Sequence, residues 1–267
     1  MTWHEHFALH AAPFTKDVAD TDLWLTPHKQ QAVDDLADAI EDRVTGALIV
    51  GDAGVGKSCV LRALRHRLRD STVRLTYCHN TTLGRRDFYR QICTALGLSP
   101  RATAAGVFDA VSTYVQELAC EQLHPVFLID EAHLLHQDVL DHLHILANYE
   151  WDSRPLLTLV FAGLPELWDR MLLRRNRSLW SRIHTRLRLP EPEPGDTAAY
   201  VDHRLQLAGA KADLFTSDAL TLLHEGSAGR LRDIDRIATA ALKAAARGNH
   251  NRVDRAIVVN IIASHQR

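Results

Sequence analysis

Gly51-Asp52-Ala53-Gly54-Val55-Gly56-Lys57-Ser58 is a complete phosphate-binding loop of the form G-x-x-x-x-G-K-S. Before it stands Ala47-Leu48-Ile49-Val50, an apolar run of strand length. After it, apolar residues recur at helical spacing: Val60, Leu61, Leu64 and Leu68. The glycines therefore stand where a buried strand turns into a helix, which is the context that the motif needs. This stretch predicts a nucleotide-binding α/β protein.

The loop assigns a role to each of its residue types. Glycines allow the backbone to aim successive N–H groups at phosphate oxygens, and the helix N-terminus adds partial positive charge. We expect Lys57 to reach the β- and γ-phosphates of ATP and the Ser58 hydroxyl to bind Mg²⁺. The nucleotide contacts that we predict here are those of Gly51, Asp52, Ala53, Gly54, Val55, Gly56, Lys57, Ser58 and Cys59.

A second part of the site stands about seventy residues further on. The apolar run 125–129 ends in Asp130 and Glu131. An acid after such a strand holds Mg²⁺ in phosphate-loop enzymes, and an adjacent Glu can polarise the attacking water as a general base. We therefore predict Asp130 as a metal ligand and Glu131 as the catalytic base of an ATPase. The alternative is a strand that ends in solvated acids.

The bulk composition allows one large domain and a small one, at 267 residues and 46% hydrophobic content. The net charge of −2 gives no independent support for a nucleic-acid partner. Four dispersed cysteines without a C-x-x-C pair are typical of reduced thiols. No apolar stretch approaches the roughly twenty residues that span a bilayer, so we expect a cytoplasmic protein without a membrane segment.

Apolar runs and helical patterns alternate along the first part of the chain. We expect strands at about 47–50, 73–77, 125–130, 156–161 and 186–189. Helices are expected at about 28–43, 57–69, 85–97, 104–119, 134–149 and 164–173. Continuous apolar strands that alternate with helices predict a parallel five-stranded sheet covered on both faces.

The composition changes at residues 190–196, an acidic, proline-rich stretch that is typical of a domain boundary. Beyond it only helical patterns follow, at about 196–208, 217–225, 229–247 and 253–265. We predict an α/β domain over residues 1–190, of which 1–45 form an N-terminal extension and the first helix. A small all-α lid domain is predicted over 191–267.

The chain resembles the ExeA-like group of the AAA+ ATPases, and the resemblance covers nearly its whole length. The stretches that carry it occur in the family's order: residues 7–14, 25–27, 130–135, 163–167, 182–186, 200–205 and 208–209. That group contains secretion-associated proteins with a transmembrane helix and a periplasmic part. It also contains free-standing ATPases that accompany a transposase, similar to the TnsC, TniB and MuB helpers.

Because the sequence ends after the lid with no membrane segment, we expect the second kind of protein. The resemblance then implies a homo-oligomer, a ring or a helical filament, on double-stranded DNA in the ATP state. Its partners would be a transposase and a target-selector protein, and its function the regulation of DNA transposition. Two alternatives stay open. One is an ATPase that energises secretion or envelope assembly with a separate membrane partner, and the other is a poorly hydrolysing scaffold.

The resemblance also implies roles for single residues. Asn80 matches a polar position that can hold the catalytic Glu away from water, although capping a turn is its other reading. Arg182, late in a helix, and Arg186, at the start of a strand, stand where an arginine that acts on a neighbouring subunit is expected. Arg232 matches the lid arginine that touches the γ-phosphate, and Thr26 and Pro27 are expected near the adenine.

One position departs from the family pattern. Leu164 stands where a polar residue, often Gln, orients water or contacts the γ-phosphate. An apolar side chain cannot do either, so slow hydrolysis is expected. For DNA, hydroxyl and arginine side chains near two helix starts suit phosphate contacts without base readout, although exposed, solvated turns are the other reading. These candidates are Thr81, Arg85, Arg86, Arg101 and Thr103.

Overall fold

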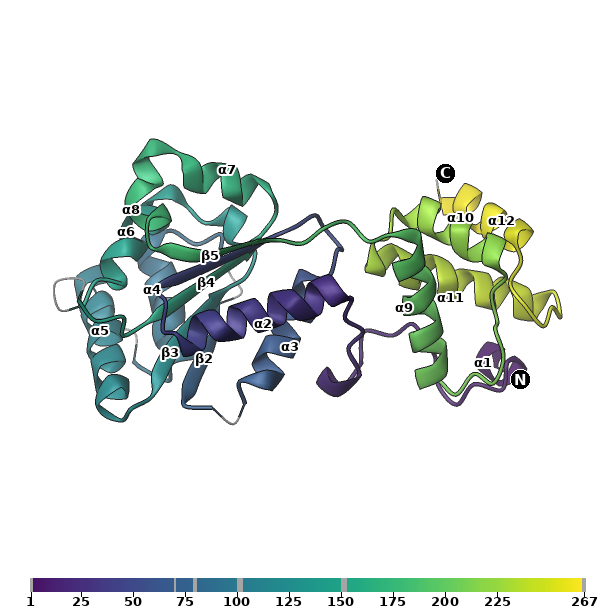
Figure 1. Cartoon of the computed structure of the whole chain (residues 1–267), viewed down its shortest axis with the longest axis horizontal. Helices are drawn as coiled ribbons and strands as arrows, with labels where there is room; N and C mark the ends of the chain where they lie inside the picture. The colour runs from purple at the N-terminus through teal and green to yellow at the C-terminus, as the bar shows by residue number, and fades with distance from the viewer. Residues whose placement is uncertain (1, 70, 79–80, 100–102, 150–152, 266–267) are drawn as a thin grey trace. The chain divides into compact units, whose positions relative to one another are not determined.

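The computed structural model describes residues 2–69, 71–78, 81–99, 103–149 and 153–265. The chain divides into two compact units (Figure 1). An α/β unit consists of residues 27–52 and 60–189, and a helical unit consists of residues 1–26, 53–59 and 190–267. Within the described ranges, no helix has both the length and the apolar content that crossing a bilayer requires.

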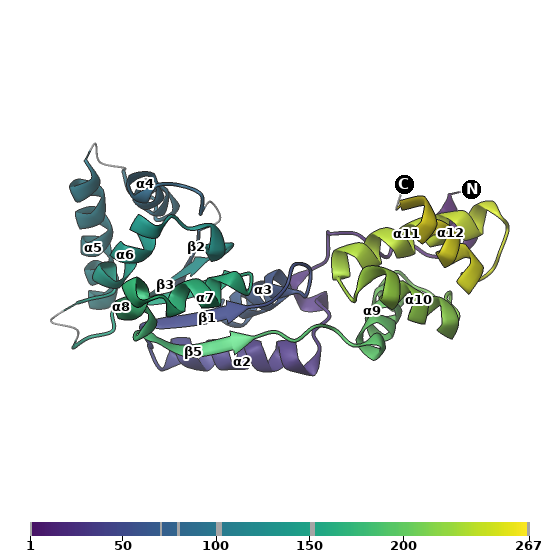
Figure 2. The same cartoon turned by 90° about the horizontal axis from the view of Figure 1, so that it is seen from above.

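The α/β unit is built on a parallel sheet of five strands in the order β2-β3-β4-β1-β5. The strands are β1 Gly46–Val50, β2 Val73–Cys78, β3 His124–Ile129, β4 Thr158–Gly163 and β5 Ile183–Arg188. Figure 2 shows β5 at one edge of this sheet. The predicted α/β fold with a five-stranded parallel sheet is confirmed.

Helices cover both faces of the sheet, and its central strands are therefore buried along their whole length. Leu48 and Phe127 point into a core shared with the helices of one face: α4 Arg85–Ala95, α5 Ala104–Cys120, α6 Gln137–Leu146, α7 Glu166–Leu172 and α8 Arg177–Trp180. Strand side chains alternate, so Ile49 and Leu128 point to the other face. There α2 (Pro27–Glu41) and α3 (Lys57–Arg67) lie along the sheet (Figure 1).

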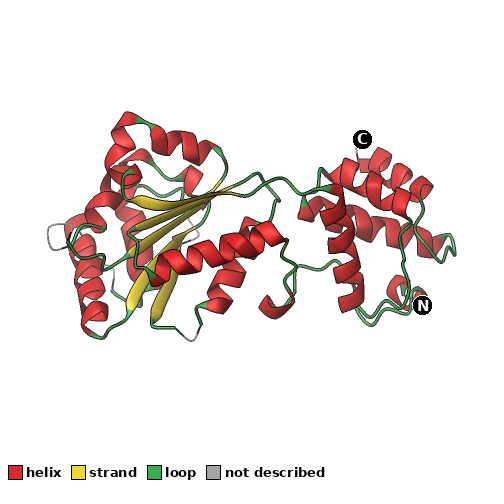
Figure 3. Cartoon of the chain, viewed as in Figure 1, coloured by secondary structure: helices red, strands yellow, loops and turns green. Residues whose placement is uncertain are grey.

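The helical unit appears in Figure 3 as helices joined by loops. Its elements are α1 Trp3–His6, η1 Asp20–Asp22, α9 Pro194–Leu207, α10 Ser217–Ser227, α11 Leu231–Arg247 and α12 Arg255–His265. The N-terminal segment is tied to α9 by Arg204, which donates to Pro13 O (2.8 Å) and Thr15 O (2.6 Å). The domain limits 1–190 and 191–267 stay predictions, but residues 1–26 pack here, with the C-terminal helices.

Three elements deviate most from their predicted ranges. The helix expected at 134–149 begins only at Gln137, because Glu131 is left-handed and the short 3-10 helix η2 (Ala132–Leu134) follows it. Strand β4 begins two residues later than expected, after the buried Leu156 and Leu157. Strand β5 begins at Ile183, since an edge strand with alternating burial has no continuous apolar run to mark its start.

Candidate nucleotide site

The phosphate loop leaves the carboxyl edge of the sheet directly after β1. Its first residue is anchored there, since Gly51 N donates to Gly163 O at the end of β4 (3.2 Å). Gly54 and Gly56 have φ angles of +86° and +106°, which favour glycine over residues with a Cβ. Helix α3 then begins at Lys57, so the positive end of its dipole lies at the loop and favours an anion there.

The start of α11 contacts this loop within the helical unit. Leu231 N donates to Gly54 O (3.1 Å), and a Cβ on Gly54 would lie 3.0 Å from Arg230 Cβ. The close approach is a second reason for glycine at position 54. Arg232 follows in the first turn of α11 and is exposed. The helix that carries the predicted γ-phosphate arginine therefore begins at the phosphate loop.

The two predicted acids follow β3 at the same edge of the sheet, with only β4 between β3 and β1. Asp130 is buried, and both of its carboxylate oxygens accept hydrogen bonds. Tyr77 OH donates to Oδ2 (2.8 Å), and Glu131 N donates to Oδ1 (2.9 Å). Burial and the bond to Asp130 raise the pKa of Tyr77 to about 12, so the phenol remains a donor at neutral pH.

Glu131 has a left-handed backbone, with φ +51° and ψ 35°. Residues other than glycine adopt this conformation at a cost, which suits a functional position. The Thr81 hydroxyl holds the backbone by donating to Glu131 O (2.9 Å). The side chain is half exposed, and its Oε2 lies 3.5 Å from His133 Nδ1. This carboxylate can accept a proton from water, as a general base must.

The donor set of these residues fits a nucleotide phosphate with its metal. The glycine loop presents backbone N–H groups, and Lys57 brings a cation to the first turn of α3. Ser58 presents an exposed hydroxyl and Asp130 a carboxylate, the oxygen ligands that Mg²⁺ prefers. Thr26 is buried just before α2, and Pro27 is the first residue of that helix. Their contact with an adenine stays a prediction.

Arg182 lies in the turn between α8 and β5, not in a helix, and its Nη1 donates to Ser178 O (2.9 Å). Because β5 is parallel to β1, with Gly46 opposite Ile183, this turn is at the amino edge of the sheet. The phosphate loop starts at the carboxyl edge, roughly 16 Å away for five strand residues. Arg182 is thus remote from the loop that follows β1 in its own chain.

Arg186 lies in the middle of β5, opposite Leu48, and does not open the strand. Its Nη2 donates to Trp180 O (3.0 Å), and its Cζ is 3.9 Å from the centroid of the Trp180 ring. This cation–π contact and hydrogen bond hold the guanidinium against its own chain. Of the two predicted trans-acting arginines, Arg182 therefore lies at an edge of the α/β unit, whereas Arg186 lies within the sheet. The action of Arg182 on a neighbouring chain stays a prediction.

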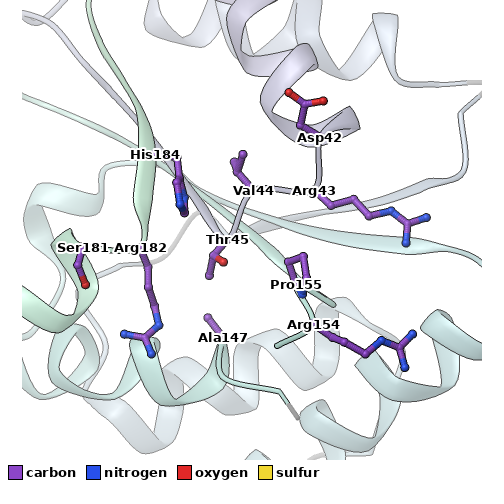
Figure 4. Close-up of a pocket in the computed structure, with 10 residues that line it drawn as sticks. All are labelled: Asp42, Arg43, Val44, Thr45, Ala147, Arg154, Pro155, Ser181, Arg182 and His184. Atoms are coloured by element: carbon purple, nitrogen blue, oxygen red, sulfur yellow. The ribbon is translucent and has the colours of Figure 1, made fainter. Parts of the chain in front are cut away.

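A pocket of about 470 Å³ lies beside Arg182 at the amino edge of the sheet (Figure 4). Besides Arg182, its lining includes Arg43 and Arg154 from the segments before β1 and β4. Figure 4 shows the guanidinium groups of Arg43 and Arg154 pointing away from that of Arg182. The three cations do not converge on one point, so the pocket is not an assembled anion site.

The predicted DNA residues have different environments. Arg85 and Arg86 are exposed at the start of α4, and Thr103 is exposed as the N-cap of α5. Thr81 is buried with its hydroxyl on Glu131 O, an orientation that speaks against a DNA contact. Arg101, and Asn80 at the predicted polar position near Glu131, lie outside the described residues.

Sequence reasoning missed Tyr77 and His133 as neighbours of the acids. Tyr77 lies in the second strand, but its position in the sequence does not indicate that this strand pairs with β3. His133 lies in the same Asp-Glu-Ala-His run as the acids, but its spacing gives no direction for its ring. The left-handed turn at Glu131 sets the direction of the His133 ring. No sequence pattern indicates this turn, because glutamate rarely adopts a left-handed conformation.

Comparisons with known proteins agree with this geometry. Residues 42–171 match a family described as "AAA domain". The chain is 34% identical over 250 residues to general secretion pathway protein A of Aeromonas hydrophila. That match covers 92% of this chain but only 45% of the relative, so the chain spans less than half of the relative's length. Together, the family match and the identity to this relative support the resemblance to ExeA-like AAA proteins.

Solved structures show the same fold at lower identity. Cdc6p of Pyrobaculum aerophilum matches with a TM-score of 0.72 and 17% identity, over 90% of this chain and 67% of that one. The ORC1 protein of Aeropyrum pernix, solved in complex with DNA, matches with a TM-score of 0.70 and 20% identity, over 95% and 68%. The RuvB branch migration motor of Thermotoga maritima matches with a TM-score of 0.61 and 16% identity, over 94% and 73%.

Proposed function

Because residues 42–171 carry an AAA domain related to an ExeA-like ATPase, we propose that this chain hydrolyses ATP with Mg²⁺. The observation that carries the proposal is that β1 and β3 end at the same edge of the sheet, where Gly51, the start of the glycine loop, follows β1, and Asp130 and Glu131 follow β3. The loop and Lys57 bind the phosphates. Ser58 and Asp130 hold the metal, which neutralises charge on the transferring phosphoryl group. Glu131 accepts the proton of the attacking water.

A pair of variants tests this division of labour. Lys57→Ala should abolish ATP binding, because the phosphates lose their cation. Glu131→Gln should keep ATP affinity and lose turnover by about a hundredfold or more, the contribution of a general base. Nucleotide affinity is measured by titration with a fluorescent ATP analogue, and turnover by release of labelled phosphate. Equal ATP affinity in the wild type and Lys57→Ala would contradict the assignment.

The arginine geometry supports an oligomeric ATPase. Arg182 lies at the amino edge, away from the loop of its own chain, and this position supports a role in a neighbour's site in a homo-oligomer. Leu164 follows β4 directly, and its apolar side chain can neither orient water nor hydrogen-bond a phosphate. Slow turnover that rises with protein concentration is the expected behaviour.

One candidate role is regulation of DNA transposition, with the oligomer forming a ring or filament on duplex DNA and recruiting a transposase. Its support is the exposed Arg85 and Arg86 at the start of α4 and the fold shared with a protein solved on DNA. DNA binding should then require ATP or a non-hydrolysable analogue and ignore base sequence. It should weaken steeply with salt, because phosphate contacts release counterions.

The DNA test uses Arg85→Ala with Arg86→Ala, and Arg174→Ala with Arg175→Ala as the matched control, since that pair is also exposed and adjacent. Gel shift or fluorescence anisotropy is measured across a salt series with duplexes of unrelated sequence. The first pair should weaken binding uniformly and flatten the salt slope, and the control pair should not. ATP-loaded protein that leaves duplex DNA unbound at low salt would remove this role.

The second candidate role is an ATPase that energises secretion or envelope assembly through a membrane partner. The 34% identity to a general secretion pathway protein favours it over transposition, since the DNA-bound neighbour shares only the fold. In that role ATP turnover would be indifferent to DNA. Turnover measured with and without duplex DNA therefore separates the two candidates.

A further inference from the structure

The peptide that joins Gly163 to Leu164, at the end of β4, contacts both halves of the candidate site. Its carbonyl oxygen accepts from Gly51 N, the first residue of the phosphate loop (3.2 Å). Its N–H donates to His133 Nδ1 (3.4 Å). One peptide plane therefore connects the loop after β1 with the segment that follows the acids.

His133 in turn reaches Glu131. Its Nδ1 lies 3.5 Å from Glu131 Oε2, and the His133 side chain is only 14% exposed, whereas that of Glu131 is 50% exposed. The same ring nitrogen thus faces a backbone donor and a carboxylate acceptor. A nitrogen carries either a proton or a lone pair, so it can satisfy only one of these partners at a time.

The backbone around His133 fixes the ring in this position. Arg170 of α7 donates to His133 O, and through Nη2 to Leu135 O (2.8 Å), which clamps the turn after the acids. Gly163 leaves the room that the ring needs, since a Cβ there would lie 3.3 Å from His133 Nδ1 and 3.2 Å from His133 N. The ring is held by neighbours on both sides, as a positioning group must be.

We propose that His133 is the positioning residue for Glu131, coupling it to the phosphate loop through the Gly163–Leu164 peptide. With the proton on Nδ1, the ring donates to Glu131 Oε2 and orients the carboxylate. With the proton on Nε2, Nδ1 accepts from Leu164 N and the carboxylate is released. The ring supplies the polar contact that the apolar Leu164 side chain cannot make. This role rests on the proposed ATPase activity.

Substitutions that separate the two ring nitrogens test the proposal. His133→Ala should lower kcat about tenfold to a hundredfold, part of what an oriented general base contributes, with KM for ATP changed less than about twofold. His133→Asn, whose amide lies near the position of Nδ1, should restore most of kcat. His133→Gln, whose amide lies near that of Nε2, should not. His136→Ala is the matched control, because that exposed histidine bonds Thr82 O.

A double-mutant cycle distinguishes positioning from a general structural role. In a Glu131→Gln background, His133→Ala should change the residual turnover less than about twofold, because the carboxylate that it orients is gone. Thermal melts and ATP-analogue affinity are measured on every variant. If His133→Ala does not fold, the contrast between Asn and Gln decides the matter alone.

The outcomes for the two proposals differ. A wild-type chain without turnover would overturn the ATPase proposal and this one with it. Turnover that Glu131→Gln lowers about a hundredfold or more, but that the His133 variants leave unchanged, would overturn only the role of His133. Equal losses in the Asn and Gln variants, or an undiminished effect of His133→Ala in the Glu131→Gln background, would also overturn it.

Discussion

His124 is a buried titratable side chain at the amino end of β3, away from the acids. Its Nε2 lies 2.8 Å from Thr158 Oγ1, and that hydroxyl donates its proton to Val44 O (2.6 Å). The threonine oxygen must therefore accept from the ring, which makes Nε2 the protonated nitrogen. Burial, with a smaller effect of the Arg43 charge, lowers the pKa of His124 to about 4.

This histidine predicts a loss of stability in mild acid. The unfolded chain takes up a proton near the ordinary pKa of 6.5, whereas the folded chain resists it down to about 4. The stabilisation is complete above the unfolded pKa and is lost as the pH falls from there toward the folded pKa. Between about pH 7.5 and about pH 5, the free energy of unfolding should fall by about 1–2 kcal/mol on this account.

Denaturant titrations at a series of pH values measure this slope. His124→Gln keeps a hydrogen-bonding side chain without a titrating ring, so its slope should be shallower by the same amount, whatever its stability at neutral pH. A variant with the wild-type slope would show that other groups cause the acid sensitivity.

The loop between β1 and α3 makes a prediction at the level of an element. Gly54→Ala should weaken ATP binding and cost about 1 kcal/mol of stability, because an alanine is strained at positive φ. Gly97→Ala is the matched control: its φ is also positive (+74°), but no atom lies within 4 Å of the added Cβ. It should show the stability cost with unchanged ATP affinity. Equal ATP affinity in both variants would contradict the proposed cradle.

Elements with a strong periodic pattern could be predicted from the sequence, whereas an element whose start depends on a preceding turn could not. Strands β1 and β3 are buried along their whole length, so their apolar runs gave correct positions. Helices α9 to α12 follow clear helical spacing, and their predicted ranges are close to the observed ones. The start of α6 was missed because the left-handed Glu131 delays it, a conformation that propensity does not indicate.

The parts of the candidate site that consist of consecutive residues could be predicted from sequence motifs. These are the loop from Gly51 to Ser58 and the acids after β3. Contacts between distant segments could not be predicted, because a hydrogen bond such as that of Tyr77 to Asp130 depends on the order of the strands in the sheet. The same holds for His133 and the peptide after Gly163. The buried environment of Thr81 was hidden for this reason too, since its partner is a backbone atom fifty residues away.

At the scale of the whole molecule, the position of Arg182 has a consequence for how copies work together. Within the α/β unit, this arginine and the start of the phosphate loop are at opposite edges of one sheet. A chain that lacks Arg182 therefore keeps its own phosphate loop and acids, and a chain that lacks Lys57 keeps its arginine. Under the proposed trans role of Arg182, two inactive chains of these kinds carry complementary halves of one active interface.

We therefore predict that Arg182→Ala and Lys57→Ala each lose turnover alone and regain part of it when mixed. Only interfaces with the Arg182→Ala loop facing the Lys57→Ala arginine are complete, so recovery should peak near equal amounts and disappear on dilution. An arginine supplied by a neighbour contributes about a thousandfold or more in known phosphoryl transfer, so the recovery is measurable against a low background. Mixing Lys57→Ala with Glu131→Gln is the control without recovery, because neither chain offers an intact base behind an intact loop. Brisk turnover by Arg182→Ala on its own would contradict the trans role and leave Arg186 as the remaining candidate.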